Sequence, residues 1–185
     1  MIEQLISDTE DRMQKAVEAL RRDLATLRTG RASAALVEHL QVDYYDSPMP
    51  LNQLANISVP EARLITIQPW DKQALSQIEK AILQANLGLN PSNDGSIIRV
   101  PIPTLTEERR KELVTVVHQR MEEGRVSLRN ARRDSIEQVR SLEKSKDISE
   151  DERRRAEDRL QKLTDEYTKR INDLGQAKER ELIET

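Results

Sequence analysis

The sequence predicts an α+β protein in which an elongated antiparallel three-helix bundle carries one small inserted β/α/β domain. Charged residues make up 34% of the 185 residues and hydrophobic residues 36%, whereas ordinary globular domains hold about 25% and about 45%. Apolar residues nevertheless recur at helical spacing toward both ends of the chain, which excludes disorder. Between residues 31 and 104 this spacing gives way to short strand-like runs. A long, thin helical core interrupted by a compact insert satisfies all three observations.

The first predicted helix covers residues 2–28 and has no Gly or Pro inside it. Its apolar side chains fall within an arc of roughly 120°, which is typical of one buried helix face. At 1.5 Å per residue the helix is about 40 Å long. The residues of this face are Ile2, Leu5, Ile6, Met13, Ala16, Val17, Leu20, Leu24 and Leu27.

Two longer helices follow the insert. The second covers residues 106–146, and Thr106 suits its N-cap because acidic residues follow it at the positive end of the helix dipole. The third opens at the capping box Ser149–Glu152. Only residues 146–148 separate these two helices, so we expect antiparallel neighbours. The apolar stripes of all three helices then face one another as a bundle.

Two glycines lie inside the predicted long helices, Gly124 in the second and Gly175 in the third. Each costs about 1 kcal/mol relative to Ala. We interpret them as points of close helix contact, and a functional bend is the alternative.

The insert between residues 30 and 104 reads as a compact domain of strands and one short helix. Alternating or β-branched residues favour strands, and Gly, Pro, Asn and Asp mark the turns. The predicted domains are therefore a bundle of residues 1–29 plus 105–185 and an insert of residues 30–104. Within the insert we expect strands at 40–45, 56–59, 63–68 and 96–100, a helix at 72–86, a turn at 46–50 and a loop at 90–95.

The chain crosses between the predicted domains twice, and the two crossings form a candidate hinge. Gly permits changes in backbone angle, while Pro stiffens its own segment. A helix C-cap at Gly30 and an extended linker before Thr106 are the structural alternative, and both interpretations can hold together. The candidate hinge residues are Arg28, Thr29, Gly30, Arg31, Pro101, Pro103, Thr104 and Thr106.

The sequence holds no catalytic or metal-binding motif. It has no cysteine, and its two histidines, His39 and His118, lack His or Cys neighbours at metal-ligand spacing. No run approaches the roughly 18 apolar residues that span a bilayer. The formal net charge of −3 disfavours non-specific nucleic-acid binding, so any RNA contact must come from a local basic surface. We therefore expect a cytoplasmic, monomeric binding protein that is not an enzyme and has no cofactor, metal or membrane partner.

One basic surface stands out on the second predicted helix. Five arginines project within roughly 100° of one another, about 120° from the apolar stripe, and are expected to face outward. Only Asp134 and Glu137 offset them within residues 125–140. Arg guanidiniums match phosphate oxygens in pairs, so an RNA contact is one interpretation and a solvated, salt-bridged face is the other. This arginine row consists of Arg125, Arg129, Arg132, Arg133 and Arg140.

Several stretches of the chain form one ordered series. They are Leu27–Ser33, Tyr44-Tyr45 with Pro48–Leu51, Leu87–Pro91, Ile98–Pro103 running into Leu105–Arg110, Arg129–Asp134 and the Lys146–Glu150 turn. In this order they resemble the bacterial ribosome recycling factor family over nearly the whole chain.

The resemblance implies an L-shaped, tRNA-like molecule that binds the ribosome after termination. With elongation factor G and GTP, such factors split the ribosome into subunits and release mRNA and tRNA. The bundle is implied to lie on large-subunit rRNA, with Arg132 as the leading contact and Arg129 and Arg133 beside it. Arg125 and Arg140 rest on the helical geometry alone. The crossings at residues 28–31 and 101–106 are implied to be the hinge.

The chain departs from the family pattern at two positions. Asp46 stands where the family usually has Gly, and Ala34 stands where Pro is common. Two other classes of function remain open from the residues: a coiled-coil chaperone or adaptor with an inserted β domain, and an enzyme housed in the insert.

Overall fold

The computed structural model describes residues 1–184, and Thr185, the last residue of the predicted bundle domain, lies outside the described residues. By its internal contacts the chain divides into a helical unit of Met1–Leu24 and Lys111–Ile183 and a second unit centred on Ala25–Arg110. The domain boundaries predicted from the sequence lie between residues 29 and 30 and between residues 104 and 105. In the structure the boundaries lie between residues 24 and 25 and between residues 110 and 111. The second unit therefore includes both segments in which the chain passes between the predicted domains.

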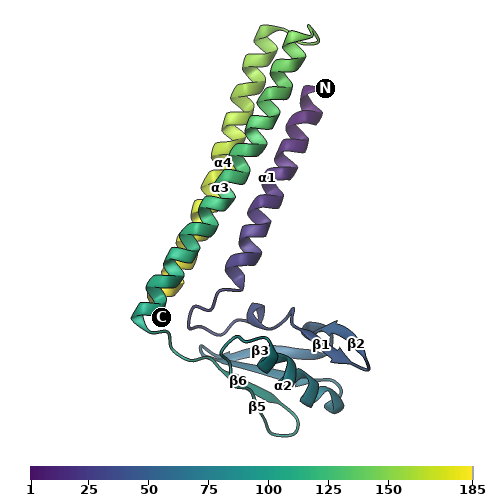
Figure 1. The fold of residues 1–185 in the computed structure, drawn as a ribbon, viewed down its shortest axis with the longest axis vertical. Helices are drawn as coiled ribbons and strands as arrows, with labels where there is room; N and C mark the ends of the chain where they lie inside the picture. The colour runs from purple at the N-terminus through teal and green to yellow at the C-terminus, as the bar shows by residue number, and fades with distance from the viewer. Residues whose placement is uncertain (185) are drawn as a thin grey trace. The chain divides into compact units, whose positions relative to one another are not determined.

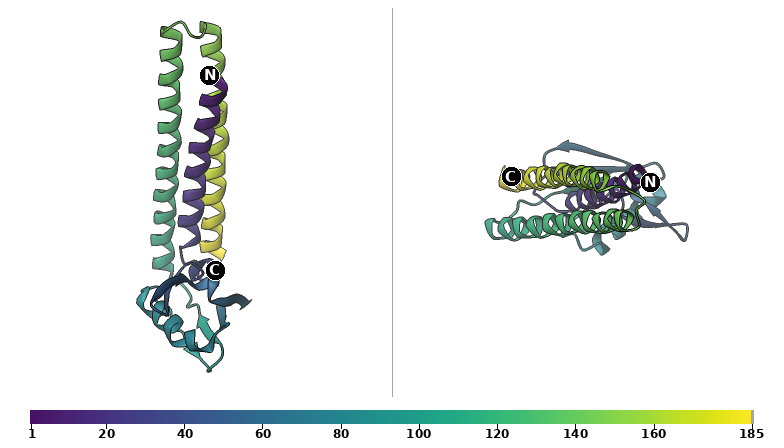
Figure 2. Two further views of the ribbon diagram at one scale, coloured as in Figure 1. Left: turned by 90° about the vertical axis from the view of Figure 1, so that its right-hand side faces the viewer. Right: turned by 90° about the horizontal axis from the view of Figure 1, so that it is seen from above.

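Three long helices make up the helical unit: α1 (Ile2–Ala25), α3 (Glu107–Lys144) and α4 (Glu150–Glu184). The three helices run alongside one another in the views of Figures 1 and 2. Interhelical contacts fix the directions, because α3 is antiparallel to both other helices while α1 and α4 are parallel. These contacts are Thr9–Ser135 and Arg12–Asp134 between α1 and α3, Glu3–Arg159 and Glu10–Tyr167 between α1 and α4, and Arg140–Glu157 between α3 and α4.

Both predicted N-caps of the long helices are confirmed. The Arg109 N–H donates to Thr106 Oγ1 at 3.1 Å. At the start of α4 the Glu152 N–H donates to Ser149 Oγ at 3.1 Å, and the Ser149 N–H donates to Glu152 Oε1 at 3.3 Å, which is a reciprocal capping box. These caps satisfy backbone donors that have no partner inside the helix, so they fix where each helix begins.

Most buried side chains of the helical unit are apolar, and its buried Thr and Ser residues among those described are Thr9, Ser135 and Thr164. Leu128, Leu160 and Ile171 are fully buried. Thr9 and Ser135 are also buried and share a hydrogen bond between α1 and α3. A buried hydroxyl without a partner costs about 1–3 kcal/mol, so this pair favours the alignment of α1 and α3 that joins the two groups.

The two helical glycines are points of close packing, as the sequence analysis expected. A Cβ built at Gly124 would lie 3.0 Å from Ile171 Cδ1. A Cβ at Gly175 would overlap the Met121 side chain. Both contacts join α3 to α4, and Gly at these positions therefore lets the two helices approach each other.

The second unit contains two small antiparallel sheets and the helix α2 (Leu75–Gln84) (Figure 1). The first sheet is a hairpin of β1 and β2, and the second has the strand order β3-β4-β6-β5. The structure confirms the predicted short helix but moves its start, because a 3₁₀ turn at Lys72–Ala74 precedes it. The strands are β1 (Gln41–Tyr44), β2 (Ser47–Pro50), β3 (Ala55–Glu61), β4 (Leu64–Pro69), β5 (Ser92–Asn93) and β6 (Ile98–Pro101).

The sequence analysis missed two of these strands. It expected a turn at residues 46–50, where β2 pairs with β1, and a loop at residues 90–95, where β5 pairs with β6. β2 contains two prolines, which argue against a strand in sequence-based reasoning, but edge strands tolerate Pro. β5 has two residues, too few to show any alternation. The core beneath the sheets is apolar and includes Ile65, Ile67, Ile78, Ile82 and Val100.

The turn between β1 and β2 has left-handed backbone angles at both central residues. Tyr45 has φ 50° and Asp46 has φ 61°, while Tyr44 pairs with Ser47. A two-residue hairpin turn with both φ angles positive is type I′, which favours Gly or Asn. The departure at Asp46 therefore places a strained residue in a turn that a Gly would fit.

Candidate nucleic-acid interface

The arginine row lies on α3 in the helical unit, but its members differ in exposure. The side chains of Arg129, Arg133 and Arg140 are 56%, 64% and 65% exposed. The Arg125 side chain is 29% exposed, and Arg132 is half-buried. The prediction that all five project outward is therefore right for three residues and needs correction at Arg125 and Arg132, which are only partly exposed.

Arg125 is held between α3 and α4. Its Nη2 and Nε donate to Asn172 Oδ1 at 2.7 and 3.1 Å, and its Nη1 donates to Glu122 Oε2 at 3.2 Å. The guanidinium is thus engaged on two sides. Arg125 acts first as a link between the two helices, and its contact with a ligand would require it to give up these partners.

Arg129 shares the carboxylate of Glu122. Arg129 Nη2 donates to Glu122 Oε1 at 2.7 Å. The guanidiniums of Arg129 and Arg125 lower the pKa of the Glu122 carboxyl below its usual value. Since both Arg129 and Glu122 are more than half exposed, solvent screens the pair and it contributes little to stability. A phosphate group can therefore replace Glu122 at Arg129 at little cost.

Arg133 and Arg140 also face carboxylates. Arg133 Nε lies 3.9 Å from Asp134 Oδ1, at the outer limit of an ion pair. Arg140 Nε donates to Glu157 Oε1 of α4 at 3.0 Å. Both guanidiniums are largely solvated, so they keep donors available for a second acceptor.

Arg132 differs from the rest of the row. Within residues 1–184 its guanidinium forms no ion pair with a carboxylate, and its Nε is buried without a hydrogen-bond partner. A buried N–H without an acceptor costs about 1–3 kcal/mol. That N–H is closed to solvent, so an external oxygen would approach the Nη donors of Arg132, which are not buried in this way and have no carboxylate partner among residues 1–184. Arg132 is therefore the member of the row whose local environment most favours an external acceptor.

Three partners of the row, Glu122, Glu157 and Asn172, lie outside residues 125–140 and were not predicted from the sequence. Glu122 lies three residues before Arg125 and seven before Arg129, so helical spacing could have identified it. Glu157 and Asn172 lie on α4. Their approach depends on the register of two antiparallel helices, which short-range spacing does not contain.

Three of the eight candidate hinge residues, Arg28, Pro101 and Thr104, are bonded within the second unit. Arg28 Nη1 donates to the Leu87 carbonyl at 3.1 Å. Thr104 Oγ1 accepts from Arg63 Nη1 at 3.3 Å. Pro101 lies in β6. These crossings are therefore parts of the second unit and do not form free linkers.

The other candidate hinge residues differ in their burial. Arg31 and Pro103 are exposed, whereas Thr29 is buried. Gly30 has φ 84°, a backbone conformation that favours Gly. Because α1 ends at Ala25, Gly30 does not cap that helix, and the alternative interpretation of Gly30 as a C-cap is wrong.

The rest of the described chain offers little for catalysis. Residues 1–184 contain no group of three or more His, Cys, Asp or Glu side chains that could hold a metal. His118 pairs with Glu179 of α4, and His39 with Glu38. No helix among these residues is long and apolar enough to cross a membrane.

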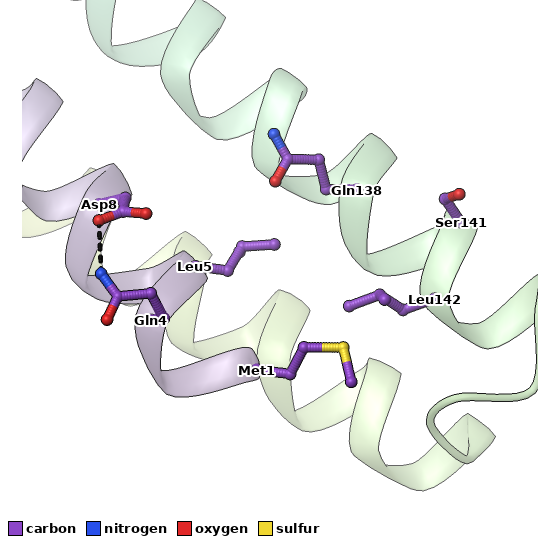
Figure 3. Close-up of a pocket in the computed structure, with 7 residues that line it drawn as sticks. All are labelled: Met1, Gln4, Leu5, Asp8, Gln138, Ser141 and Leu142. Carbon is purple, nitrogen blue, oxygen red and sulfur yellow. Dashed lines mark hydrogen bonds between the residues drawn. The ribbon is translucent and has the colours of Figure 1, made fainter.

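An open hollow of about 610 Å³ lies between the first turns of α1 and the later part of α3 (Figure 3). Leu5 and Leu142 point toward each other inside it, and Gln4 donates to Asp8 at 2.8 Å. Asp8 is its one ionisable side chain, so the hollow lacks the acid–base pair that most hydrolytic chemistry needs. It is lined by Met1, Gln4, Leu5, Asp8, Gln138, Ser141 and Leu142.

Comparison with known proteins gives one consistent result. The sequence model of the family described as ribosome recycling factor matches residues 20–183. The ribosome-recycling factor of Syntrophomonas wolfei is 58% identical over 184 residues and covers 100% of both chains. That of Chloroflexus aurantiacus is 57% identical over 183 residues and covers 99% of both.

Solved structures agree with the sequence comparison. A solution structure of a ribosome recycling factor superposes with a TM-score of 0.83 at 50% identity, covering 100% of this chain and 98% of the other. A second similar chain, with a TM-score of 0.71, 48% identity and 98% coverage of both chains, comes from a study of the T. thermophilus ribosome recycling factor and E. coli elongation factor G bound to the E. coli post-termination complex.

Proposed function

Because the chain belongs to the ribosome recycling factor family, we propose that it binds the post-termination ribosome and, with elongation factor G and GTP, separates the subunits. Release of mRNA and tRNA follows from that separation. The family consists of translation factors that are not enzymes, so the free energy comes from GTP hydrolysis by the partner. The site of action is the cytoplasm. The observation that carries this proposal is the full-length similarity to recycling factors.

We propose that the arginine row is the surface that holds the protein on large-subunit rRNA. Arg132 leads because no carboxylate among the described residues pairs with its guanidinium, so a phosphate would not have to displace one. Arg129 and Arg133 follow, since their ion pairs are solvent-exposed and weak. Arg140 and Arg125 contribute less, because each is engaged with a residue of α4.

We further propose that the second unit moves relative to the bundle as the partner acts. The predicted joint spans residues 28–31 and 101–106. Arg28, Pro101 and Thr104 are bonded within the second unit. The backbone rotation would therefore take place at the neighbouring residues. Among these, Gly30 has the greatest backbone freedom.

Subunit separation on a sucrose gradient tests the function directly. Post-termination ribosomes are incubated with the protein, elongation factor G and GTP, and the fraction that sediments as subunits is measured. We expect subunits only when all three components are present. Intact ribosomes in the complete reaction, with a known recycling factor active in parallel, would contradict the proposal. Omission of GTP, and of the factor, are the matched controls.

A further inference from the structure

Three of the four aromatic side chains of the protein lie in one part of the second unit. The chain has one Trp, three Tyr and no Phe. Tyr45 in the β1–β2 turn is 72% exposed, and Trp70, directly after β4, is 69% exposed. The hydroxyl groups of Tyr44 and Tyr45 both bond to side chains of the segment that follows Trp70. Tyr44 Oη donates to Asp71 Oδ2 at 2.7 Å, and Tyr45 Oη donates to Gln73 Oε1 at 3.0 Å.

The two exposed rings are carried by well-bonded backbone. The Trp70 N–H donates to the Leu54 carbonyl at 3.2 Å. The Tyr44 and Tyr45 rings pack edge to face with centroids 4.5 Å apart. The Tyr45 ring is therefore held on two sides, and a partner that covers it would lose little conformational entropy in ordering it. Large exposed aromatics that are held in place are typical of binding surfaces, where Trp and Tyr contribute most of the affinity.

The charges near these rings select the kind of partner. Asp43 and Asp46 are exposed beside Tyr45, and Asp71 follows Trp70. Lys72 is the one cation within residues 41–47 and 69–74. A phosphate backbone would be repelled by these carboxylates, whereas the guanidinium of an arginine can pair with a carboxylate and stack on an aromatic ring. The surface thus favours a basic protein over RNA.

The mode of binding is limited by the edge strand β2. Pro48 and Pro50 pair with Asp43 and Gln41 of β1. Neither proline has an N–H, and in a paired strand their ring nitrogens face the outer edge. That edge therefore cannot donate the regular hydrogen bonds of an added strand. A partner has to recognise the side chains.

We propose that the aromatic edge, defined as Tyr45 and Trp70 with Asp43 and Asp46, docks on an arginine- or lysine-rich protein surface in the recycling complex. This inference rests on the proposed function, because it requires the protein to act inside that complex. The bundle holds RNA through its arginines, and the aromatic edge holds protein through rings and carboxylates.

Site-specific photo-crosslinking tests the identity of the partner. A benzophenone amino acid replaces Trp70 in the full-length chain, which is then irradiated on post-termination ribosomes with elongation factor G and GTP. We expect a protease-sensitive adduct whose attachment site lies in an arginine- or lysine-rich segment. The same amino acid at Leu83, which is 57% exposed on α2, is the matched control. A ribonuclease-sensitive adduct, an attachment site without basic residues, or no adduct at Trp70 would each overturn the inference.

Charge variants test the recognition itself. The double variant D43N/D46N neutralises both carboxylates. Asn at position 46 tolerates positive φ, so the turn is kept. We expect the yield of the Trp70 adduct to fall roughly two- to tenfold, because the pairing with basic residues is lost. If the partner were RNA, the yield of the Trp70 adduct would rise, because removal of the carboxylates would remove their repulsion of the phosphates.

The activity of ring variants completes the test. We expect W70A/Y45N to slow subunit separation at least about tenfold, because the two aromatic side chains at the centre of the contact are lost. The control variant L83A should separate subunits at a rate within about twofold of the unchanged protein. Asn at position 45 accepts the positive φ, so the turn is kept. W70A/Y45N that separates subunits at the normal rate would refute the inference. Failure of the unchanged protein to separate subunits would instead refute the proposed function, and the two failures are thus distinguishable.

Discussion

Arg132 illustrates how a single side chain can favour an external ligand. Its Nε is buried without an acceptor, while Arg140 on the same helix is 65% exposed and bonded to Glu157. A guanidinium without a carboxylate partner loses no ion pair when it binds a phosphate, whereas Arg140 would exchange one acceptor for another and gain little. We therefore expect the existing partners of each arginine, as well as its exposure, to decide how strongly it binds.

We expect R132A to weaken ribosome binding about ten- to a hundredfold, because charge-assisted hydrogen bonds are worth about 1.5–3 kcal/mol. R140A, with the same charge change on the same helix, should lose less than about fivefold. Ribosome pelleting at several salt concentrations measures both affinities, and far-ultraviolet circular dichroism checks that α3 is intact. Equal affinity of R132A and the unchanged protein would remove Arg132 from the interface.

The turn residue Asp46 should be replaceable with a gain in stability. Its φ of 61° costs Asp some backbone strain, less than for most residues with a Cβ, and is free of strain for Gly. We expect D46G to raise the free energy of unfolding by about 0.5–1 kcal/mol. The neighbouring variant S47G, at a strand position, should lower it by a similar amount. Urea unfolding of both proteins gives the comparison, and a loss of stability in D46G would contradict the type I′ assignment.

Tyr44 gives a pH-dependent signal. Its hydrogen bond to the Asp71 carboxylate raises the pKa of Tyr44 to about 12, above the usual value of about 10. The protonated phenol is therefore favoured in the folded state. Its contribution to stability is fully present below about pH 10 and is lost as pH rises through the folded pKa.

We expect D71N to move the pKa of Tyr44 back toward the usual value, because the charged acceptor is gone. Tyrosinate absorbance during an alkaline titration measures the change, and Y44F assigns it. If D71N and the unchanged protein give the same titration curve, the bond between Tyr44 and Asp71 does not hold in solution.

At the scale of elements, the helices could be predicted from sequence because their signals are local. Thr106 and the Ser149–Glu152 box mark where helices begin, and the structure contains both sets of bonds. β2 could not be predicted, because its four residues include Pro48 and Pro50 and Pro is rare in strands. Its existence depends on pairing with β1 across the turn at residues 45 and 46.

The same limit applies to the arginine row. Its position on α3 follows from helical spacing alone. Its partners on α4, Glu157 and Asn172, do not, because they depend on how two helices align over many turns. The glycines are an intermediate case. Their cost inside a helix indicates close contact, but the sequence does not say that Gly175 faces Met121 while Gly124 faces Ile171.

The two glycines should respond differently to the same substitution. Ala gains about 1 kcal/mol of helix propensity at either site. At Gly175 the new Cβ would overlap Met121 Sδ and lie 2.6 Å from its Cγ, so either the Met121 side chain must take another rotamer in the core or α3 and α4 must move apart. We expect G175A to lower the free energy of unfolding by about 1–2 kcal/mol net. G124A, whose Cβ would meet the end of Ile171 at 3.0 Å, should change it by less than about 1 kcal/mol.

Urea unfolding followed by helical circular dichroism measures both glycine variants. The comparison holds the chemistry of the substitution fixed and changes only the contact between α3 and α4. Equal stabilities would mean that the Met121 side chain can move aside without cost, and the contact at Gly175 would then not restrict how closely the helices pack.

At the scale of the whole molecule, the proposed function divides the work between two units. The bundle holds the ribosome through the arginine row, and the second unit moves and, by our further inference, docks on protein. This division predicts that binding and subunit separation can be impaired independently. Variants of the arginine row should weaken both processes. Variants of the joint between the units should weaken separation alone.

Gly30 offers the sharpest test of this division, because the chain contains a matched control. Gly30 and Gly95 both lie in the second unit with left-handed backbone angles, φ 84° and φ 93°. Gly95 lies in the loop between β5 and β6, where an added Cβ would meet nothing within 4 Å. An Ala at either site is strained by about 1–2 kcal/mol, so G95A matches G30A in backbone strain, while Gly30 is buried and Gly95 is exposed.

We expect G30A to keep its affinity for ribosomes within about threefold, since the arginine row is untouched, and to slow subunit separation at least about tenfold, because Ala narrows the backbone angles at the joint. G95A should do neither. Ribosome pelleting and sucrose gradients run on the same samples give the two quantities for each variant. If G30A loses affinity and separation to the same extent, Gly30 supports binding and the units do not divide the work. If G95A slows separation as much as G30A, the effect comes from lower stability of the second unit, and the joint at Gly30 plays no special part.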